Sequence, residues 1–385
     1  MARILHISDL HIGARLGRYS QNADIRRCLD HICAYAKAEA IDALLLAGDI
    51  FDTYNPSGES EEIYYEFLDS LSSSGIKIFI IAGNHDNHER LNAPAAFLKR
   101  HSAYIMTGVS DGRGEAIEIK IGGEKIAFIL LPFITDAQLI DIAGYSDEKE
   151  AAAAYREKFA TTVLNAAEKA DAATKILITH AFCKNSTPCG SERPVQRGNS
   201  LLVEAGLFAG AFSYCAFGHL HRYQKVCENA FYSGSIIPVS IDEAAYEKKM
   251  ILIETGKGAG VKTEAIGLPR FSSYKNISGA FVDVYDSVRK LQSAFITIIF
   301  NEAITLLDQD NLLKAAREND VKIVSLGFDL SSKTAVNENS FADFQSLKMP
   351  ELFKRYLASL GEEAEDELIG KFGEIYSKIQ QERRL

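Results

Sequence analysis

The chain lacks the features of membrane-spanning proteins, of disulfide frameworks and of proteins that coat nucleic acid by charge alone. Its longest apolar run, Ile126 to Ile134, contains Pro132 and is well short of the roughly 18 residues that span a bilayer. The six cysteines form no C-x-x-C pair, and six in a chain of 385 residues are no disulfide framework. The net charge of −10, from 42 basic and 52 acidic residues, excludes a general polycation but not a nucleic-acid enzyme with local basic residues.

From the first residues of the sequence we expect no secretory signal peptide. Met1, Ala2 and Arg3 lead straight into the apolar run Ile4–Ile7, which is typical of a buried strand. Because unpaired cysteines are typical of a reducing compartment, we expect a cytoplasmic protein that makes no contact with membranes.

Short apolar runs alternate with amphipathic stretches through the first half of the chain. The apolar runs predict strands buried on both faces, at Ile4–Ile7, Ala43–Ala47, Ile76–Ala82 and Lys175–Thr179. The amphipathic stretches predict helices near residues 22–39, 59–73, 89–99 and 148–170. This alternation indicates an α/β layered fold with a largely parallel sheet.

The pattern changes twice further along the chain. Residues 116–121 and 125–131 predict a hairpin, and short strands follow between about 214 and 267, two of them joined by a turn at 256–258. After 267–269, strands and helices form a small α+β unit, and the polar segment 331–340 leads to two helical stretches, about 350–359 and 363–382. We therefore expect three domains, at residues 1–268, 270–340 and 346–385.

Polar residues follow five of the predicted strands at the point where each strand ends. They are Asp9-Leu10-His11, Gly48-Asp49 with Asp52, Gly83-Asn84-His85-Asp86, Thr179-His180, and Gly218-His219-Leu220-His221. In open α/β sheets the carboxyl edge of the strands is where sites are built, so we expect these side chains to converge.

The residue types at these strand ends suit divalent metals. Asp, His and Asn supply oxygen and imidazole ligands without a thiolate, a set that favours Mn²⁺, Fe²⁺, Zn²⁺ or Co²⁺. Two ions about 3.5–4 Å apart need a bridging carboxylate and can clamp both oxygens of an in-line displacement. Asp49 is the natural bridge, because its strand lies between two other ligand-bearing strands. Alternation along an extended segment would point His219 and His221 the same way, so that each could serve one ion.

Each motif alone has an ordinary structural explanation. An isolated Asp-x-His is usually a surface loop or a helix cap, an isolated Gly-Asp is usually a turn, and His180 alone would more often be a packed core histidine. The five together, in this order and each after a strand, favour a dimetal site. His85 follows Asn84, and we expect its imidazole beside the metals, where it could donate to a leaving oxygen.

On these residues the chain resembles the calcineurin-type metallophosphoesterases, whose motifs read D-x-H, G-D, G-N-H-D/E, H and G-H-x-H. It is similar, more narrowly, to the nuclease subunits of bacterial DNA-repair complexes built on an SMC-like ATPase. The segments that carry this narrower resemblance are Ile4–Gly13, Ala47–Asp52, Ala82–Asp86, Phe217–Arg222, and Tyr232–Ser240 with Asp242-Glu243. The last of them has no metal-binding duty and therefore separates this group from other phosphoesterases.

The resemblance implies a sandwich of two sheets flanked by helices, with two metal sites that share Asp49. Carried over residue by residue, the first site falls on Asp9, His11, Asp49 and His221, and the second on Asp49, Asn84, His180 and His219. His85 matches the catalytic histidine of the family, which is not a metal ligand. Some relatives have a second histidine after the Gly-Asp motif where this chain has Asp52, so no catalytic role is carried over to that position.

The resemblance also implies an activity and partners. The activity is that of a two-metal-dependent DNA nuclease, a double-strand exonuclease and single-strand endonuclease of DNA repair and recombination, with two Mn²⁺ ions as cofactors. The partners are double- and single-stranded DNA, a second copy of the chain, and the SMC-like ATPase, in a nucleoid-associated heterotetramer. In this group the unit at 270–340 caps the active site and helps to hold DNA.

Two parts of the chain are candidate interaction surfaces. Basic residues near the motifs could contact DNA phosphates, although each could equally be an ordinary surface charge: Arg15, Arg18, Arg90 and Arg222, with Arg193, Arg197 and Lys225 beside them. The two tail segments carry apolar residues at helical spacing. These helices either pack back on the cap or, as the resemblance implies, dock onto the ATPase.

Two other functions are weighed against a DNA nuclease. A phosphodiesterase for a small phosphodiester or a cyclic nucleotide would use the same metal ligands, but it needs neither the segment Tyr232–Ser240 nor the two carboxyl-terminal modules. A catalytically inactive scaffold of a repair complex is disfavoured, because every ligand position and His85 are present.

Overall fold

The computed structural model describes residues 1–109, 114–141, 144–192, 202–256, 260–329, 353, 368–373 and 376. Residues Met1–Phe328 form one compact unit, and Asp329–Leu385 form a second. Within the described residues, no helix combines the length and the apolar character needed to cross a membrane.

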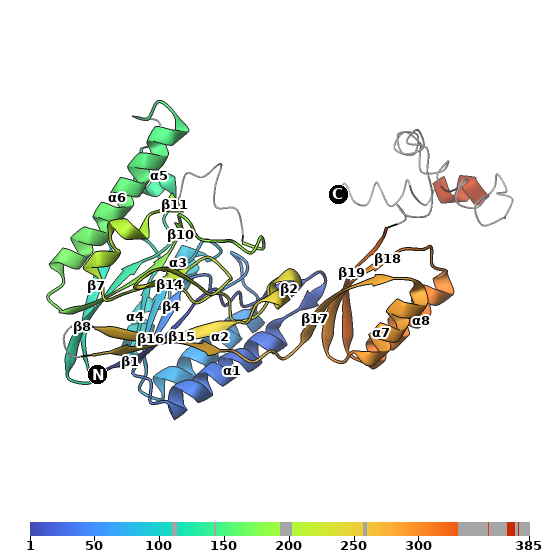
Figure 1. Ribbon diagram of the computed structural model, residues 1–385, viewed down its shortest axis with the longest axis horizontal. Helices are drawn as coiled ribbons and strands as arrows, with labels where there is room; N and C mark the ends of the chain where they lie inside the picture. Colours follow the sequence, from blue (N-terminus) through green and yellow to red (C-terminus); the bar gives the residue numbers. More distant parts are fainter. Residues whose placement is uncertain are drawn as a thin grey trace. The chain divides into compact units, whose positions relative to one another are not determined.

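The first unit is built on two six-stranded sheets (Figure 1). The first sheet has the order β16 (Val261–Gly267), β15 (Lys249–Thr255), β1 (Arg3–Ile7), β4 (Ala43–Ala47), β5 (Lys77–Ile81) and β6 (Ala103–Met106). Strands β1, β4, β5 and β6 are parallel, and β15 and β16 form an antiparallel hairpin beside β1. The turn predicted at 256–258 lies largely outside the described residues.

The second sheet has a parallel centre and an antiparallel pair at each edge. Its order is β13 (Gln224–Cys227), β14 (Ala230–Tyr232), β12 (Tyr214–Gly218), β9 (Thr174–His180), β8 (Glu124–Leu131) and β7 (Glu115–Ile121). The hairpin of β7 and β8 and the parallel pairs β8–β9 and β9–β12 confirm the layered α/β prediction. Shorter strands accompany the sheets, as pairs of β2 (Arg15–Leu16) with β3 (Tyr19–Ser20) and β10 (Phe182–Cys183) with β11 (Leu202–Val203).

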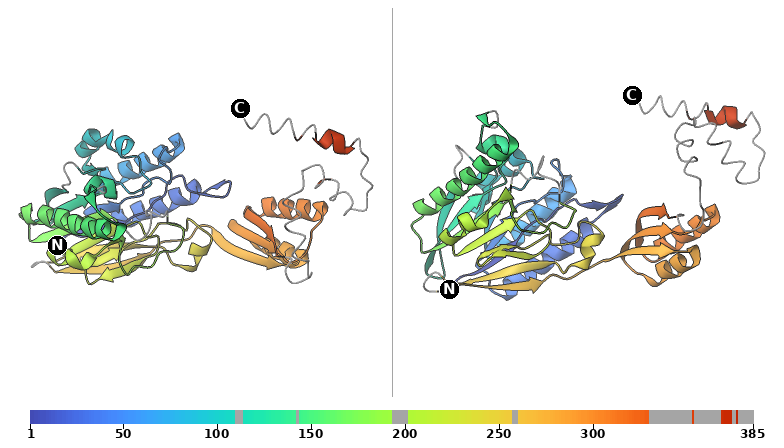
Figure 2. Two further views of the ribbon diagram at one scale, coloured as in Figure 1. Left: turned by 90° about the horizontal axis from the view of Figure 1, so that it is seen from above. Right: turned by 45° about the horizontal axis from the view of Figure 1, so that its top comes forward.

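The two sheets stack face to face between layers of helices (Figure 2). Side chains alternate along each strand. In β4, Leu44 and Leu46 therefore enter the core under the helices of the first sheet, while Leu45 enters the core between the sheets. There the rings of Phe79 and Phe128 stack with their centroids 3.8 Å apart. A third core lies between the second sheet and its covering helix.

The helices mostly follow the predicted ranges. Helices α1 (Asn22–Ala38) and α2 (Gly58–Ser72) lie side by side over the first sheet, and α6 (Glu148–Lys169) covers the second (Figure 1). The single helix predicted near 89–99 is wrong, because α3 (His88–Asn92) ends before Pro94 and α4 (Ala95–Arg100) begins after it. Proline has no N–H to donate and disfavours helical backbone in the preceding residue. A further short helix, α5 (Asp136–Leu139), precedes α6.

Residues 273–328 form a small sheet with its own core. Strands β17 (Ser273–Gly279), β18 (Ala294–Phe300) and β19 (Val321–Phe328) are all parallel, and the helices α7 (Phe281–Lys290) and α8 (Leu306–Glu318) connect them. Val284, Ile296 and Leu312 lie in the buried core between these helices and the sheet. The part expected as α+β thus consists of two consecutive βαβ crossovers, in which helices and strands alternate.

A small apolar cluster joins this sheet to the rest of the first unit. Leu16 of β2 and Ile241 pack with Tyr274 and Phe295 of the small sheet. In the second unit, residues 368–373 are helical, and the rings of Phe353 and Phe372 stack 4.2 Å apart. The predicted linker 331–340, the helix at 350–359 apart from Phe353, and most of the helix at 363–382 lie outside the described residues.

Candidate metal centre

The five motif segments converge where the carboxyl ends of the two sheets meet. Strands β1, β4 and β5 are neighbours in the first sheet, and β9 and β12 are neighbours in the second. The parallel direction of these strands brings their following loops to one edge. Asn84 is half-buried and the other candidate ligands are buried, namely Asp9, His11, Asp49, His180, His219 and His221.

Asp9, His11 and His221 form the first group that could hold a metal ion. The Nε2 atoms of His11 and His221 face each other at 3.0 Å. Asp52 lies behind His11, with its Oδ1 3.3 Å from the imidazole Nδ1. The loop after β4 thus orients an imidazole of the loop after β1.

Asp9, Asp49 and His180 form the second group, and Asn84 lies beside it. The Oδ1 atom of Asn84 is 3.0 Å from Nε2 of His180 and 3.1 Å from Nδ1 of His219. The backbone N–H of His219 donates to the carboxylate of Asp9 at 3.0 Å. Residues from five segments of the chain therefore surround one small space.

Asp9 belongs to both groups, and Asp49 of the second group also lies near His11 of the first. The Oδ2 atom of Asp49 is 3.8 Å from Nε2 of His11 and 3.5 Å from Nε2 of His180. Its Oδ1 accepts the backbone N–H of His85 at 2.9 Å, which fixes the orientation of the carboxylate. This placement suits the bridging role that the order of the strands predicted for Asp49.

The atoms that face this space suit a cation, because they are hydrogen-bond acceptors and too few protons lie between them. Nδ1 of His180 donates to the carbonyl oxygen of Ala47 at 2.9 Å, so that its Nε2 presents a lone pair. That lone pair faces Asn84 Oδ1 and Asp49 Oδ2, which are also acceptors. A proton or a metal ion must therefore occupy this space.

The protonation equilibria show the same excess of acceptors. Burial disfavours the charged form of Asp49, but the imidazoles of His180, His85 and His11 outweigh it and hold the carboxyl pKa well below its usual range. Burial likewise opposes protonation of His180, yet the attraction of Asp49 raises its pKa to about 9. Burial raises the pKa of Asp9 and lowers that of His219 to about 3. The centre is therefore built to hold added positive charge.

His85 lies beside these groups, in the loop after β5. Its Nδ1 donates to the carbonyl oxygen of Asp52 at 2.8 Å, and its Nε2 is 3.9 Å from Asp49 Oδ2. His11, Asp52 and His85 form a further group of close ligand atoms. Since the Asp52 carbonyl engages Nδ1, proton exchange with a bound molecule falls to Nε2.

The backbone adopts unusual conformations at these positions. Asp9, His11, Asp49 and His219 all have positive φ, at 52°, 46°, 51° and 107°. Such backbone is strained for residues with a side chain and clusters at functional sites. The value at His219 shows that the extended segment predicted for His219–His221 is wrong. Both imidazoles still face the centre, because a bend rather than strand alternation orients them.

Gly83 is required by the close approach of two loops. A Cβ atom on Gly83 would lie 2.1 Å from Asp49 Oδ1, which no real contact permits. Asp86, in the same loop, accepts the backbone N–H groups of Gly83 at 2.8 Å and Phe51 at 3.0 Å. Together these residues hold the loop after β5 against the loop after β4.

Sequence reasoning missed the residues behind His221. The segment Asp242-Glu243 carried the narrower resemblance, but no role was assigned to it. Glu243 is buried, and its Oε1 accepts Nδ1–H of His221 at 3.0 Å. Ser191 also lies against this pair, with its Oγ 3.0 Å from His221 Nδ1. Neither residue stands at a strand end, so strand-end position could not reveal them.

The candidate DNA-contacting arginines that the structure describes are exposed, and they already have neighbours within the chain. The Arg15 guanidinium donates to the carbonyl of Arg18 in the β2–β3 turn. Arg90 donates to Glu61 Oε1 at 2.8 Å. Arg222 lies over the ring of Tyr246, 4.4 Å from its centroid. Arg193 and Arg197 lie outside the described residues.

Comparison with known proteins agrees with this architecture. Residues 2–223 match the family model described as calcineurin-like phosphoesterase. The chain is 34% identical over 269 residues to the SbcD subunit of the nuclease SbcCD from Bacillus subtilis (strain 168), which covers 66% of this chain and 67% of that protein. It is 33% identical over 283 residues to the SbcD subunit from Rhodobacter capsulatus, and the match covers 70% of this chain and 69% of that protein. The SbcD subunit from Escherichia coli (strain K12) is 28% identical to this chain over 278 residues, and the match covers 69% of this chain and 68% of that protein. The chain therefore belongs to the calcineurin-like phosphoesterase family and, within it, to the SbcD nuclease subunits.

Proposed function

We propose that the chain is a two-metal-dependent DNA nuclease, a double-strand exonuclease and single-strand endonuclease of DNA repair and recombination. The observation that carries the proposal is the convergence of buried Asp and His groups from five loops around Asp49. The similarity to SbcD subunits supports DNA as the substrate.

The proposed metal ions are a pair of Mn²⁺. Asp9, His11, Asp49 and His221 would hold the first, and Asp49, Asn84, His180 and His219 the second. When bound, such ions supply Lewis-acid chemistry, in that they acidify water and neutralise phosphoryl charge. Oxygen and imidazole ligands of this kind suit Mn²⁺.

His85 is the proposed catalytic histidine. The hydrogen bond from its Nδ1 to the carbonyl of Asp52 holds the ring, so that Nε2 can carry a proton toward the departing sugar oxygen. Asp52 supports this role through its backbone, and it also orients His11 through its carboxylate.

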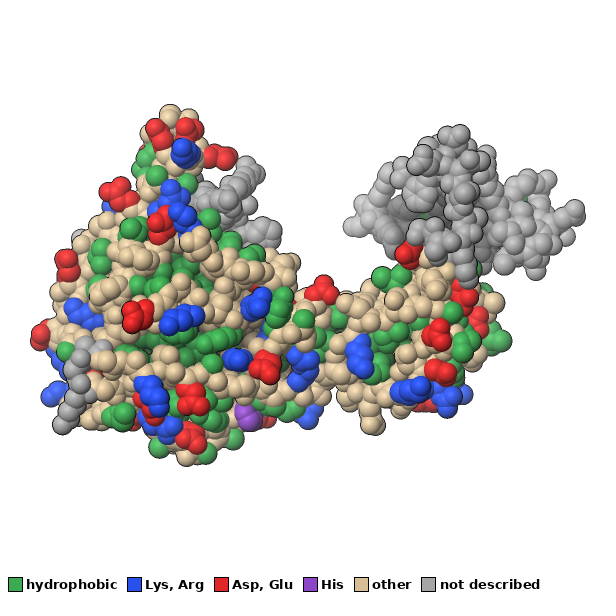
Figure 3. All heavy atoms as spheres, viewed as in Figure 1, with side chains coloured by type: hydrophobic (Ala, Val, Ile, Leu, Met, Phe, Trp, Pro, Cys, Tyr) green, Lys and Arg blue, Asp and Glu red, His purple; other side chains and the backbone are tan. Residues whose placement is uncertain are grey.

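Contacts to DNA are proposed at Arg15, Arg18, Arg90 and Arg222. On the face drawn in Figure 3, Lys and Arg are interspersed with Asp and Glu, so any phosphate-binding positive charge there is local. Arg15 and Arg18 lie in the β2–β3 hairpin, whose Leu16 packs against Phe295 of the small sheet. The unit at 270–340 is proposed to cap the site from this side.

The proposed partner is an SbcC-type ATPase, because the relatives are named as components of the nuclease SbcCD. We place its docking segment at residues 346–385 and propose a heterotetramer with two copies of this chain. Deletion of 346–385 should abolish co-purification with the ATPase while Mn²⁺-dependent cleavage remains. Retained co-purification would move the docking surface elsewhere.

A labelled duplex digested with Mn²⁺, beside turnover of bis-p-nitrophenyl phosphate, tests the activity. We expect shortening of the duplex that stops when EDTA removes the metal. Rapid turnover of the small ester with an intact duplex would instead support the alternative, a phosphodiesterase for small phosphodiesters or cyclic nucleotides.

A further inference from the structure

A buried carboxylate stands directly behind one of the proposed metal ligands. Glu243 is 1% exposed, and its Oε1 lies 3.0 Å from Nδ1 of His221. The opposite ring nitrogen of His221, Nε2, faces His11 at the centre. A carboxylate that accepts Nδ1–H fixes the tautomer and orientation of the ring and makes Nε2 a better ligand.

Glu243 is held in place by further bonds. Its Oε2 accepts from Nζ of Lys248 at 2.5 Å and from Oγ of Ser235 at 3.3 Å. The same ammonium donates to the carbonyl oxygen of His221 at 3.0 Å, so Lys248 binds both Glu243 and His221. Burial opposes ionisation of Glu243, but His221 and Lys248 overcome it and lower its pKa to about 2.

The backbone around Glu243 is anchored on its far side as well. Glu243 lies in the short helix η4 (Asp242–Ala245). Arg270, in the connection to the small sheet, donates to the carbonyl oxygens of Ala244 at 2.9 Å and Tyr246 at 3.2 Å. Asn276 of β17 donates to Asp242 Oδ1 at 3.1 Å. The carboxylate is thus fixed between the metal centre and the small sheet.

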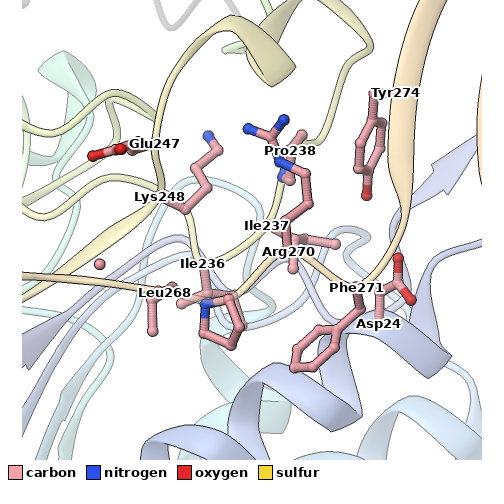
Figure 4. Close-up of a pocket in the computed structure, with 12 residues that line it drawn as sticks. Asp24, Ile236, Ile237, Pro238, Glu247, Lys248, Leu268, Arg270, Phe271 and Tyr274 are labelled. Carbon is pink, nitrogen blue, oxygen red and sulfur yellow. The ribbon is translucent and has the colours of Figure 1, made fainter.

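Lys248 also borders a pocket of roughly 450 Å³. Figure 4 shows Lys248 and Arg270 on its wall, above the apolar side chains Ile236 and Leu268. An uncharged, flexible side chain at position 248 would therefore meet apolar neighbours. This makes it possible to remove the charges of Glu243 and Lys248 together.

From this geometry we propose that Glu243 is a positioning residue that holds His221 in its metal-binding orientation, with Lys248 holding Glu243. The inference rests on the proposed metal centre and deepens it. Glu243 contacts no substrate, and it acts on metal affinity through one imidazole. Loss of such a supporting carboxylate typically costs 10–100-fold in metal affinity.

Mn²⁺ titration by calorimetry, with Mn²⁺ electron paramagnetic resonance to distinguish paired from single ions, tests the proposal on the full chain. The variants are Glu243→Gln, and Glu243→Gln with Lys248→Met in case the lone lysine prevents folding. Glu247→Gln is the matched control, because its side chain is 82% exposed and it pairs only loosely with Lys249, at 3.5 Å. Thermal unfolding without metal checks that each variant is folded.

We expect the wild type and Glu247→Gln to bind two ions and to give the paired signal. Both Glu243 variants should bind one ion at least 10-fold more weakly and lose the paired signal. In a His221→Ala background, Glu243→Gln should change Mn²⁺ affinity no further, because the two act through one ligand.

The outcomes separate two kinds of failure. If the wild type binds no Mn²⁺ pair, the proposed function itself is wrong. If the wild type binds two ions and the folded Glu243 variants bind them equally tightly, only the positioning role is overturned. Additive losses in the His221→Ala background would also overturn it, since Glu243 would then act by another route.

Discussion

Nδ1 of His180 donates to the carbonyl oxygen of Ala47 across 2.9 Å, and this bond joins the second sheet to the first at the metal centre. His180 ends β9, and Ala47 ends β4. A Cβ atom on Gly218 would lie only 1.8 Å from the same carbonyl oxygen of Ala47. The proposed ligands of one ion therefore come from two sheets whose separation is set by packing.

The first prediction concerns the core between the sheets. Phe79→Ala removes a ring that stacks on Phe128 and should lower the free energy of unfolding by about 3–5 kcal/mol. Phe97→Ala is the control, because Phe97 is 61% exposed and its loss should cost about 0.5 kcal/mol or less. Denaturant unfolding measures both. Equal losses for the two variants would contradict the packing described here.

The second prediction concerns Gly83. In Gly83→Ala the new methyl group would meet Asp49 Oδ1, so the carboxylate between the two proposed sites must move. We expect Mn²⁺ affinity to fall at least 10-fold, and stability to fall by about 1–3 kcal/mol. Calorimetric titration and thermal unfolding check the two effects.

Gly58→Ala is the matched control for that substitution. Gly58 is the first residue of α2, and nothing lies within 4 Å of a Cβ placed there. Its Mn²⁺ affinity should equal that of the wild type. Wild-type affinity in Gly83→Ala as well would show that Asp49 is not the shared ligand.

The third prediction separates His85 from the ligands. His85→Gln should leave the binding of two Mn²⁺ ions intact but remove most nuclease activity, about 10²–10⁴-fold, because the proton donor is lost. Cleavage of a labelled duplex and Mn²⁺ titration are measured on the same sample. Cleavage at a near wild-type rate would refute the catalytic role.

The fourth prediction concerns His6, which is fully buried with its Nδ1 2.9 Å from the hydroxyl oxygen of Tyr214. Burial lowers the pKa of His6 from 6.5 to about 3, so in this range the unfolded chain binds a proton that the folded chain excludes. Its contribution to stability is therefore complete above pH 6.5 and is lost as the pH falls toward 3. The limiting slope is about 1.4 kcal/mol per pH unit.

His6→Gln removes this titration and keeps a polar partner for Tyr214. Unfolding free energies of the wild type and His6→Gln, measured between pH 7 and pH 4.5, should diverge in slope, with the wild type losing more stability toward acid. Parallel pH profiles would show that His6 does not stay neutral in the folded protein.

The long elements were predictable because local side-chain patterns encode them. Strand β4 is apolar on both faces and α1 has one apolar stripe, and both lie within a residue or two of the predicted ranges. The break at Pro94 was missed, since the apolar pattern continues through it. Strand β10 is two residues long and exists only through its pairing with β11, about twenty residues further along the chain, which no local pattern reveals.

The residues of the site likewise fall into those that local sequence predicts and those that it does not. Strand-end position brought forward Asp9, His11, Asp49 and His180, because a polar residue after a buried strand is a local signal. The bend at His219 and the carboxylate of Glu243 depend on contacts between distant segments. Those contacts become visible only once the two sheets are stacked.

The left-handed backbone at Asp9, His11, Asp49 and His219 has a consequence for protein engineering. Glycine would relax each of these positions, so a screen that selects only for heat resistance should enrich variants that have lost their ligands. Directed evolution of this enzyme therefore needs a selection for catalysis in every round, or robustness will be gained at the expense of turnover.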